Sequence, residues 1–270
     1  MNLNEDDHPI HPSTIGGINQ LPEDEKRAIY SRVIPQKLLE IYDISPTLID
    51  PKGNDLLELN CPAISSVVEL SFYHRHGAQD PVMYGEITDT LNGQIHILFY
   101  TIMDPDGPRF DVDKMPDGTS TKMGSLCRNL EAEKAAIKAG LAPAQIRPGL
   151  RMLSEGIDAF ENFVLSLEQT IFFSEPLHYH NAVILERHGF AYQQGRKLME
   201  RIHAGFAPGG DLLPRLDSST PFRQPEAAHS LRLRSWAIHD DILGEPFTDV
   251  TMYKIVGKTV DVHTCGDIPW

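Results

Sequence analysis

The chain has 270 residues, of which 41% are hydrophobic and 23% are charged, the proportions of an ordinary globular protein. Acidic residues outnumber basic ones by 38 to 24, and the formal charge of -14 would repel phosphate backbones and anionic lipids. We therefore expect neither nucleic acid nor a membrane as partner. Three scattered cysteines indicate no disulfide framework, and the polar beginning lacks the apolar run of a signal peptide, which together favour the cytoplasm.

The beginning of the chain differs in pattern from the rest. Residues 1–20 lack hydrophobic periodicity and are interrupted by prolines and glycines, so we expect a flexible tail. Short helices are predicted over 22–33, where acidic residues occupy the first turn, and over 35–42. No linker or repeat divides residues 21–270, which predicts a single α+β domain.

From Ser66 onwards the apolar residues alternate with polar ones, a period of two that is typical of strands. Asn92-Gly93 then separates two further apolar segments and tolerates the backbone of a tight hairpin turn. A similar alternation of Leu and Arg begins at Leu231, and a last segment could pair on itself around Gly257. The predicted strands lie near residues 66–76, 82–90, 94–103, 231–237 and 252–262.

The middle of the chain has helical periodicity. Ser125 can cap a helix that Gly140 ends, and the apolar residues from Leu153 to Leu167 recur at steps of three and four. A longer segment that follows Pro176 is helical by composition. The predicted helices lie near residues 126–139, 149–168 and 177–206. The expected fold is therefore an antiparallel sheet packed against a layer of helices.

Two His-x-His pairs, His74-Arg75-His76 and His178-Tyr179-His180, are the motifs that most directly suggest chemistry. In a strand, residues i and i+2 face the same way roughly 6.6 Å apart, so both imidazoles can reach one metal ion. On a helix they diverge. The first pair ends a predicted strand but has no carboxylate nearby, whereas the second has carboxylates nearby but opens a predicted helix. The metal hypothesis therefore depends on whether residues 177–180 are extended.

The leading interpretation is a cytoplasmic, metal-dependent enzyme of undetermined reaction that acts on a small-molecule substrate. The predicted ligands of a divalent metal, Fe or Zn, are His178, His180 and His239. The predicted catalytic residues are Glu186 and Asp240, as carboxylate ligand or base, and Arg234, which would orient an anionic group of the substrate. Gly-x-Ser-x-Gly, Walker and Gly-x-Gly-x-x-Gly motifs are absent from the sequence, which disfavours common serine hydrolases, P-loop enzymes and Rossmann dehydrogenases.

One segment points to another class of enzyme. Asn181-Ala-Val-Ile-Leu-Glu-Arg-His-Gly-Phe190 resembles the part of GNAT-superfamily acyltransferases in which an Asn opens a helix that ends in Tyr-Glu-Arg-x-Gly-Phe. The resemblance covers ten residues, with Leu185 in place of the tyrosine, and implies acyl transfer from coenzyme A. The family's Arg/Gln-x-x-Gly-x-Gly/Ala loop, which binds the pyrophosphate of coenzyme A, has no counterpart, because Gln145-Ile-Arg-Pro-Gly149 has a different spacing.

A coenzyme A acyltransferase is therefore the first alternative to the metal enzyme. The second alternative is a non-catalytic protein that binds a ligand or a partner through its helical layer. The sequence leaves the formation of a homo-oligomer open.

Overall fold

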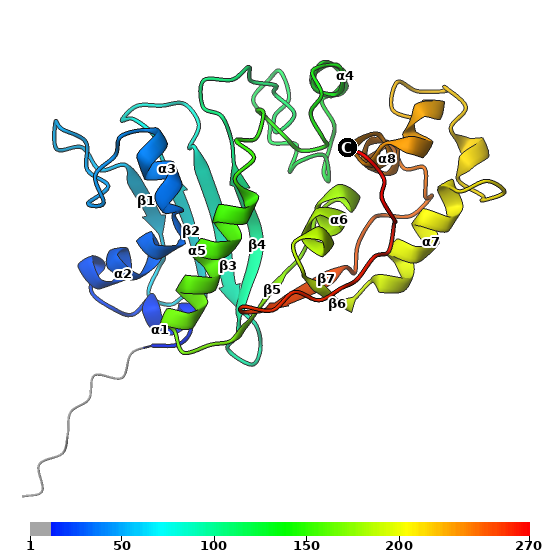
Figure 1. The fold of residues 1–270 in the computed structure, drawn as a ribbon. Coiled ribbons are helices and arrows are strands. Elements are labelled where there is room, and N and C mark those ends of the chain that lie inside the picture. The colour runs from blue at the N-terminus through cyan, green and yellow to red at the C-terminus, as the bar shows by residue number, and fades with distance from the viewer. Residues whose placement is uncertain (1–11) are drawn as a thin grey trace, which may run out of the picture.

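The computed structural model describes residues 12–270 (Figure 1). Over these residues seven strands form one sheet in the order β1-β2-β3-β4-β5-β7-β6. Neighbouring strands are antiparallel except for β4 and β5, which are parallel. Eight α-helices accompany the sheet. The predicted class, an α+β fold with a mostly antiparallel sheet packed against helices, is confirmed.

The bounds of the elements are as follows. The strands are β1 (Leu57–Asn60), β2 (Val67–Phe72), β3 (Met83–Asp89), β4 (Ile95–Ile102), β5 (Ile171–Ser174), β6 (Ala191–Gln194) and β7 (Thr251–Ile255). The helices are α1 (Ile15–Ile18), α2 (Glu23–Tyr30), α3 (Gln36–Ile41), α4 (Leu130–Lys138), α5 (Leu153–Ser166), α6 (Tyr179–Arg187), α7 (Arg196–Phe206) and α8 (Leu231–His239).

The first four strands form a meander whose two faces differ. Val68, Leu70 and Phe72 of β2 are fully buried, and the residues that alternate with them, such as Glu69, are only partly buried. Helices α2, α3 and α5 lie over one face of these strands (Figure 1), and residues such as Phe163 of α5 belong to the same hydrophobic core. The period of two in the sequence thus reflects one covered face.

Part of the predicted tail belongs to the folded core. Residues 12–20 include α1, whose Ile15 and Ile18 are fully buried. The carboxylate of Asp89, at the end of β3, accepts hydrogen bonds from the backbone N–H groups of Ile15 (2.7 Å) and Gly16 (2.8 Å). These bonds satisfy the first N–H groups of the short helix, which its own turns cannot reach. The rest of the predicted tail, residues 1–11, lies outside the described residues.

The prediction of a strand over 231–237 is wrong. This segment is helix α8, and the side chain of Ser230 caps it by accepting a hydrogen bond from the N–H of Leu233. The alternation of Leu and Arg imitates a strand, but Leu231, Arg234 and Ile238 lie at helical steps of three and four and are buried together. Helical spacing over the longer window therefore outweighs the local alternation.

Other corrections concern the ends of elements. The helix predicted over 177–206 is α6, β6 and α7, separated by Gly189 and Gly195 with φ of 81° and 93°, a conformation that glycine adopts readily. The last predicted strand is β7 alone, which pairs with β5 and β6 instead of with residues after Gly257. Strands β1 and β5 were not predicted, because runs of four residues carry little periodicity.

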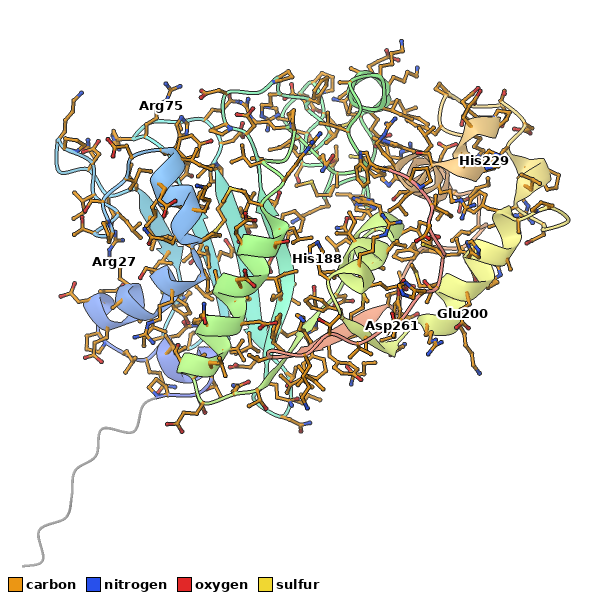
Figure 2. The ribbon with its side chains drawn as sticks, in the orientation of Figure 1. Arg27, Arg75, His188, Glu200, His229 and Asp261 are labelled. Atoms are coloured by element: carbon orange, nitrogen blue, oxygen red, sulfur yellow. The ribbon has the colours of Figure 1, made fainter. Side chains whose placement is uncertain are left out.

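Charged side chains lie mainly at the surface, and exposed examples such as Arg75, Glu200 and Asp261 project outward (Figure 2). None of the helices among residues 12–270 combines the length and the apolar character needed to cross a membrane.

Substitution Asp89→Ala should lower the free energy of unfolding by about 2 kcal/mol, because two backbone donors of α1 would lose a charged acceptor. Urea denaturation measures the change. Asp158→Ala on the exposed side of α5 is the control and should cost less than about 0.5 kcal/mol. Equal losses in the two variants would show that Asp89 does not anchor α1.

Candidate functional site

The parallel strands β4 and β5 pair over only a short stretch in the middle of the sheet. The register runs from Ile95 opposite Phe172 to Ile97 opposite Ser174, and the N–H of Glu175 donates to the carbonyl of Ile97 (3.2 Å). There β5 ends and the chain turns toward α6, while β4 continues beside β3 to its end at Ile102. The two strands therefore separate beyond Ile97.

A β-bulge lies where the strands separate. The register between β3 and β4 passes from Ile87 opposite Ile97 to Glu86 opposite Phe99, so Leu98 has no partner residue in β3. A bulge changes the phase of the strand, because one additional residue reverses which edge the following backbone groups face. The backbone groups of Ile97 face β5. A hydrogen bond at the end of β4 shows which edge the backbone groups after Leu98 face.

The backbone at the end of β4 is hydrogen-bonded to the chain that leads into β3. Met103 donates its N–H to the carbonyl of Val82 beside β3 (2.9 Å). Since backbone groups face alternate edges along a strand, Thr101 also faces β3, and Tyr100 faces the edge that β5 has left. Among residues 12–270, no strand pairs with this edge of β4 between Ile97 and the bridge at Met103. The N–H and C=O of Tyr100 thus point into the opening.

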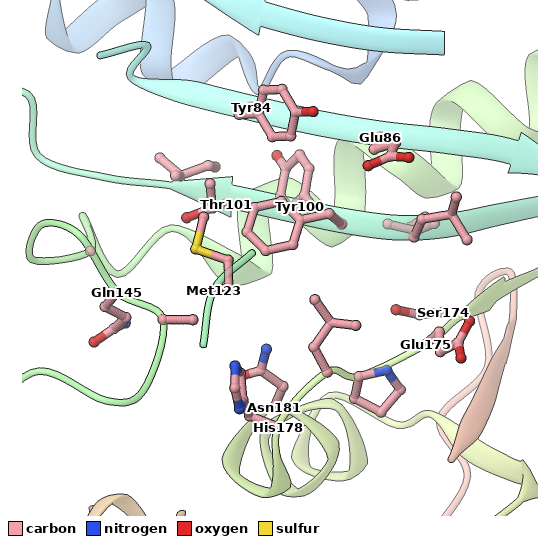
Figure 3. A pocket seen from close by; sticks show the side chains of 18 of the residues that line it. Tyr84, Glu86, Tyr100, Thr101, Met123, Gln145, Ser174, Glu175, His178 and Asn181 are labelled. Carbon is pink, nitrogen blue, oxygen red and sulfur yellow. The ribbon is translucent and has the colours of Figure 1, made fainter. Parts of the chain in front are cut away.

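A cavity of about 960 Å³ occupies the opening, within the usual range for ligand pockets (Figure 3). Its walls come from β3, β4, β5, helices α5 and α6, and the loop segments 120–125 and 143–149. One wall is apolar and includes Phe160, Phe172, Ile184 and Leu185. This wall would suit an elongated, largely apolar group.

The polar part of the lining contains groups of both signs. Glu86 of β3 and Glu175 after β5 are acidic, Lys122 is basic, and Asn181 lies at the start of α6. Burial, and then the carboxylates of Glu69 and Glu86, raise the pKa of Tyr84 to about 12. The cavity therefore has a side with negative potential near β3.

A strained turn forms another part of the wall. Lys122, Met123 and Gly124 have consecutive positive φ angles of 51°, 54° and 87°. Lys122 and Met123 line the cavity, and Met123 is seen beside Tyr100 in Figure 3. Gly124 packs so closely on His239 that a Cβ atom would lie 2.4 Å from Cε1 of the imidazole. Such strained backbone persists only where the surrounding structure holds it, and it is enriched at functional sites.

The three predicted metal-ligand histidines come together at one side of the cavity. The ring centroids of His178 and His180 are 5.8 Å apart, and those of His178 and His239 are 5.5 Å apart. His178 is the N-cap of α6 with an extended backbone (φ -136°, ψ 152°), and His180 lies in its first turn. His178 and His180 line the cavity, whereas His239 supports the strained turn from behind.

The nitrogen atoms of these rings are partly engaged. Nδ1 of His180 lies 2.7 Å from Oγ of Ser235, and Nε2 of His239 lies 3.0 Å from the buried carboxylate of Glu133. Burial lowers the pKa of His178 to about 3 and lowers the pKa of His180 well below its usual range. Across residues 12–270, no group of three or more His, Cys, Asp or Glu side chains is suited to hold a metal ion. The metal site stays a prediction that rests on the clustering of the rings.

Two predicted catalytic carboxylates have structural partners outside the cavity lining. Glu186, although on α6, is buried and accepts a hydrogen bond from the N–H of Thr264 (3.1 Å). Asp240 forms ion pairs with Arg128 (2.8 Å) and Arg223 (3.0 Å). These contacts tie the end of α8 and the C-terminal segment to the core.

Arg234 also lies outside the cavity lining. It is buried on α8, donates to the carbonyl of Ala228 (2.5 Å), lies over the ring of Phe206 (5.0 Å) and contacts His203 (3.3 Å). Its role as a substrate-orienting residue stays a prediction.

The other His-x-His pair lies elsewhere. The strand predicted over 66–76 included His74 and His76, but strand β2 ends at Phe72. Arg75 and Gly77 belong to a turn in which Gly77 has a φ of 75°. The ring of His74 packs against Tyr42, with centroids 5.3 Å apart. Neither histidine lines the cavity.

Sequence reasoning missed the open edge at Tyr100, because a bulge leaves no mark in hydrophobic alternation. One signal did point here. Four residues of the segment that resembles GNAT acyltransferases line the cavity: Asn181, Ile184, Leu185 and Phe190.

Gly124→Ala should destabilise the protein by about 2 kcal/mol more than Gly118→Ala, as measured by urea denaturation. Both glycines have a φ of 87°, so the strain of a left-handed alanine, about 1 kcal/mol, is common to the two variants. Only at Gly124 would the methyl group collide with His239, while Gly118 faces open space. Equal losses would contradict the packing described for the turn.

Stability should fall as the pH is lowered through about 6.5, the ordinary pKa of histidine. Burial lowers the pKa of His178 to about 3 in the folded protein. Between this pKa and 6.5, the unfolded chain therefore binds more protons than the folded protein. Unfolding free energies measured between pH 7.5 and 5 should fall less steeply in a His178→Asn variant than in a His263→Asn variant, since His263 is exposed. Identical slopes would show that His178 does not contribute to this pH dependence.

No family model, curated protein or solved structure matches the chain.

Proposed function

We propose that the chain is an acyltransferase that takes its acyl group from a coenzyme A thioester. The observation that carries the proposal is the unpaired edge of β4 at Tyr100, which faces a cavity between two diverging parallel strands. Ligands of sheets with parallel strands commonly bind in a crevice outside the carboxyl ends of the strands. Here β4 and β5 both end at the cavity.

The open edge suits the pantetheine arm of coenzyme A. This arm is an extended chain with amide groups, and an extended amide chain can pair with a free sheet edge as an added strand would. The C=O of Tyr100 is the group available for such pairing. The apolar wall formed by Phe160, Ile184 and Leu185 would pack against the methylene and methyl groups of the arm.

The start of α5 suits the phosphate groups. This helix spans Leu153–Ser166, and its N-cap, Met152, makes no side-chain capping bond, so its first N–H groups remain available. Arg151 is exposed directly before it. Segment 143–149, which precedes the helix, lines the cavity. The phosphates of coenzyme A would accept from these N–H groups and from Arg151.

The chemistry follows from these positions. A coenzyme A thioester would supply an activated acyl carbonyl. The N–H of Tyr100 would donate to its oxygen and stabilise the negative charge that develops when an acceptor attacks, the role of an oxyanion-hole donor. The bond from the acceptor to the acyl carbon forms, the carbon–sulfur bond breaks, and coenzyme A leaves as a thiol with the proton that the acceptor gives up. The partly buried walls around Tyr84 and Met123 would limit the access of water and so reduce hydrolysis.

Two further features support the proposal. Residues 181–190 resemble the GNAT segment, and four of them form part of the cavity wall. The cysteines are unpaired, which fits a reducing compartment such as the cytoplasm. The metal-dependent enzyme, which rests on the clustering of His178, His180 and His239, and the non-catalytic binding protein stay as alternative predictions.

Acetyl coenzyme A should bind the protein and raise its Tm, and isothermal titration calorimetry should give a Kd in the micromolar range. Ile184→Trp would fill part of the cavity from α6 and should weaken binding at least tenfold. Leu165→Trp, on the exposed side of α5, is the matched control and should bind as the wild type does. Absence of binding to the wild type at millimolar acetyl coenzyme A would refute the proposed function.

A further inference from the structure

We infer that the acyl acceptor is an amine that also carries a carboxylate, and that the start of α6 binds this carboxylate. The inference rests on the proposed acyltransferase function. It follows from two walls of the cavity, one with hydrogen-bond donors at the start of α6 and one with carboxylates on the side of β3 and β5.

The first wall is the positive end of a helix. Helix α6 has nine residues, and its N-cap, His178, makes no side-chain capping bond. His178, His180 and Asn181 all line the cavity. The start of a helix carries a partial positive charge and attracts anions, so this end of α6 favours a negative group in the cavity.

A buried imidazole adds a directed donor. His180 is only 4% exposed. Oγ of Ser235 accepts from the backbone N–H of His180 (3.5 Å) and lies 2.7 Å from Nδ1 of the ring, which accepts the hydroxyl hydrogen in the tautomer that we infer. A neutral imidazole that accepts at Nδ1 carries its hydrogen on Nε2. Among residues 12–270 no hydrogen bond engages this Nε2, so in the inferred tautomer its N–H is available to a ligand in the cavity that His180 lines.

Neighbouring side chains complete the anion-binding wall. The side-chain amide of Asn181 lies beside His178 and projects into the opening (Figure 3). The ammonium group of Lys122 belongs to the strained turn that lines the same cavity. A carboxylate could accept from several of these donors at once, because each of its oxygens accepts more than one hydrogen bond.

The opposite wall is acidic. Glu86 lies across the opening from Asn181 in Figure 3, and Glu175 lies at the side, where the chain leads from β5 to α6. Neither carboxylate forms an ion pair with Lys or Arg within residues 12–270. These groups would attract an ammonium group and repel a doubly charged phosphate. A molecule with one ammonium and one carboxylate group matches both walls.

The inference predicts a selectivity that can be measured by mass spectrometry. With acetyl coenzyme A, the wild type should acetylate an equimolar mixture of the twenty standard amino acids at least ten times faster than the mixture of the corresponding amino acid amides. The amides keep the amine and the side chain and lack only the carboxylate. Equal rates for the two mixtures would overturn the inference.

A charge substitution locates the carboxylate site. Asn181→Asp has nearly the same shape, and an acidic residue in the first turn favours the helix, so the variant should fold. It should lower the preference for acids over amides at least tenfold, because it places a negative charge beside the bound carboxylate. Asn92→Asp, in the exposed hairpin loop before β4, makes the same charge change and should leave the preference as it is in the wild type.

The outcomes separate this inference from the proposed function. Failure to bind acetyl coenzyme A refutes the acyltransferase. Binding of acetyl coenzyme A without acetylation of either mixture, or an unchanged preference in Asn181→Asp, refutes the carboxylate site and leaves the coenzyme site intact.

Discussion

The unequal pairing of the two edges of β4 is the constraint on which the site depends. On one edge β3 accompanies β4 to its end, and on the other β5 leaves after Ile97. The bulge at Leu98 turns the backbone N–H and C=O of Tyr100 toward the edge that β5 no longer covers. A regular strand would have turned these groups toward β3. The sheet thus keeps its cohesion on one side and offers hydrogen-bonding groups on the other.

The second half of the chain closes the opening from the other side. Helix α6 brings its positive end to the cavity, and α8 supports it through Ser235 and His239. The ion pair of Glu133 with Arg128 (2.6 Å) joins this support to the chain that leads from the strained turn into α4. The buried rings of His180 and His239 are therefore held by Ser235 and Glu133 from α8 and α4.

Sequence-based prediction succeeded where a hydrophobic pattern extends over several residues and failed for short elements. The alternation in β2, β3 and β4 predicted these strands to within a few residues, because each has one covered face. Strand β5 was missed, since four residues with adjacent buried phenylalanines have no period. In the site, the His-x-His motif located the cavity wall at His178 and His180. Residues such as Glu186 could not be judged, because its partner Thr264 is distant in sequence.

The most direct test of the central claim is the hydrogen exchange of single backbone amides in β4, measured by NMR. In the free protein the N–H of Tyr100 should exchange rapidly, while that of Thr101, which faces β3, should be protected. Saturating acetyl coenzyme A should slow the exchange of Tyr100 at least tenfold. Protection of Tyr100 equal to that of Thr101 in the free protein, or exchange of Tyr100 that acetyl coenzyme A leaves unchanged, would contradict the open edge as the binding site.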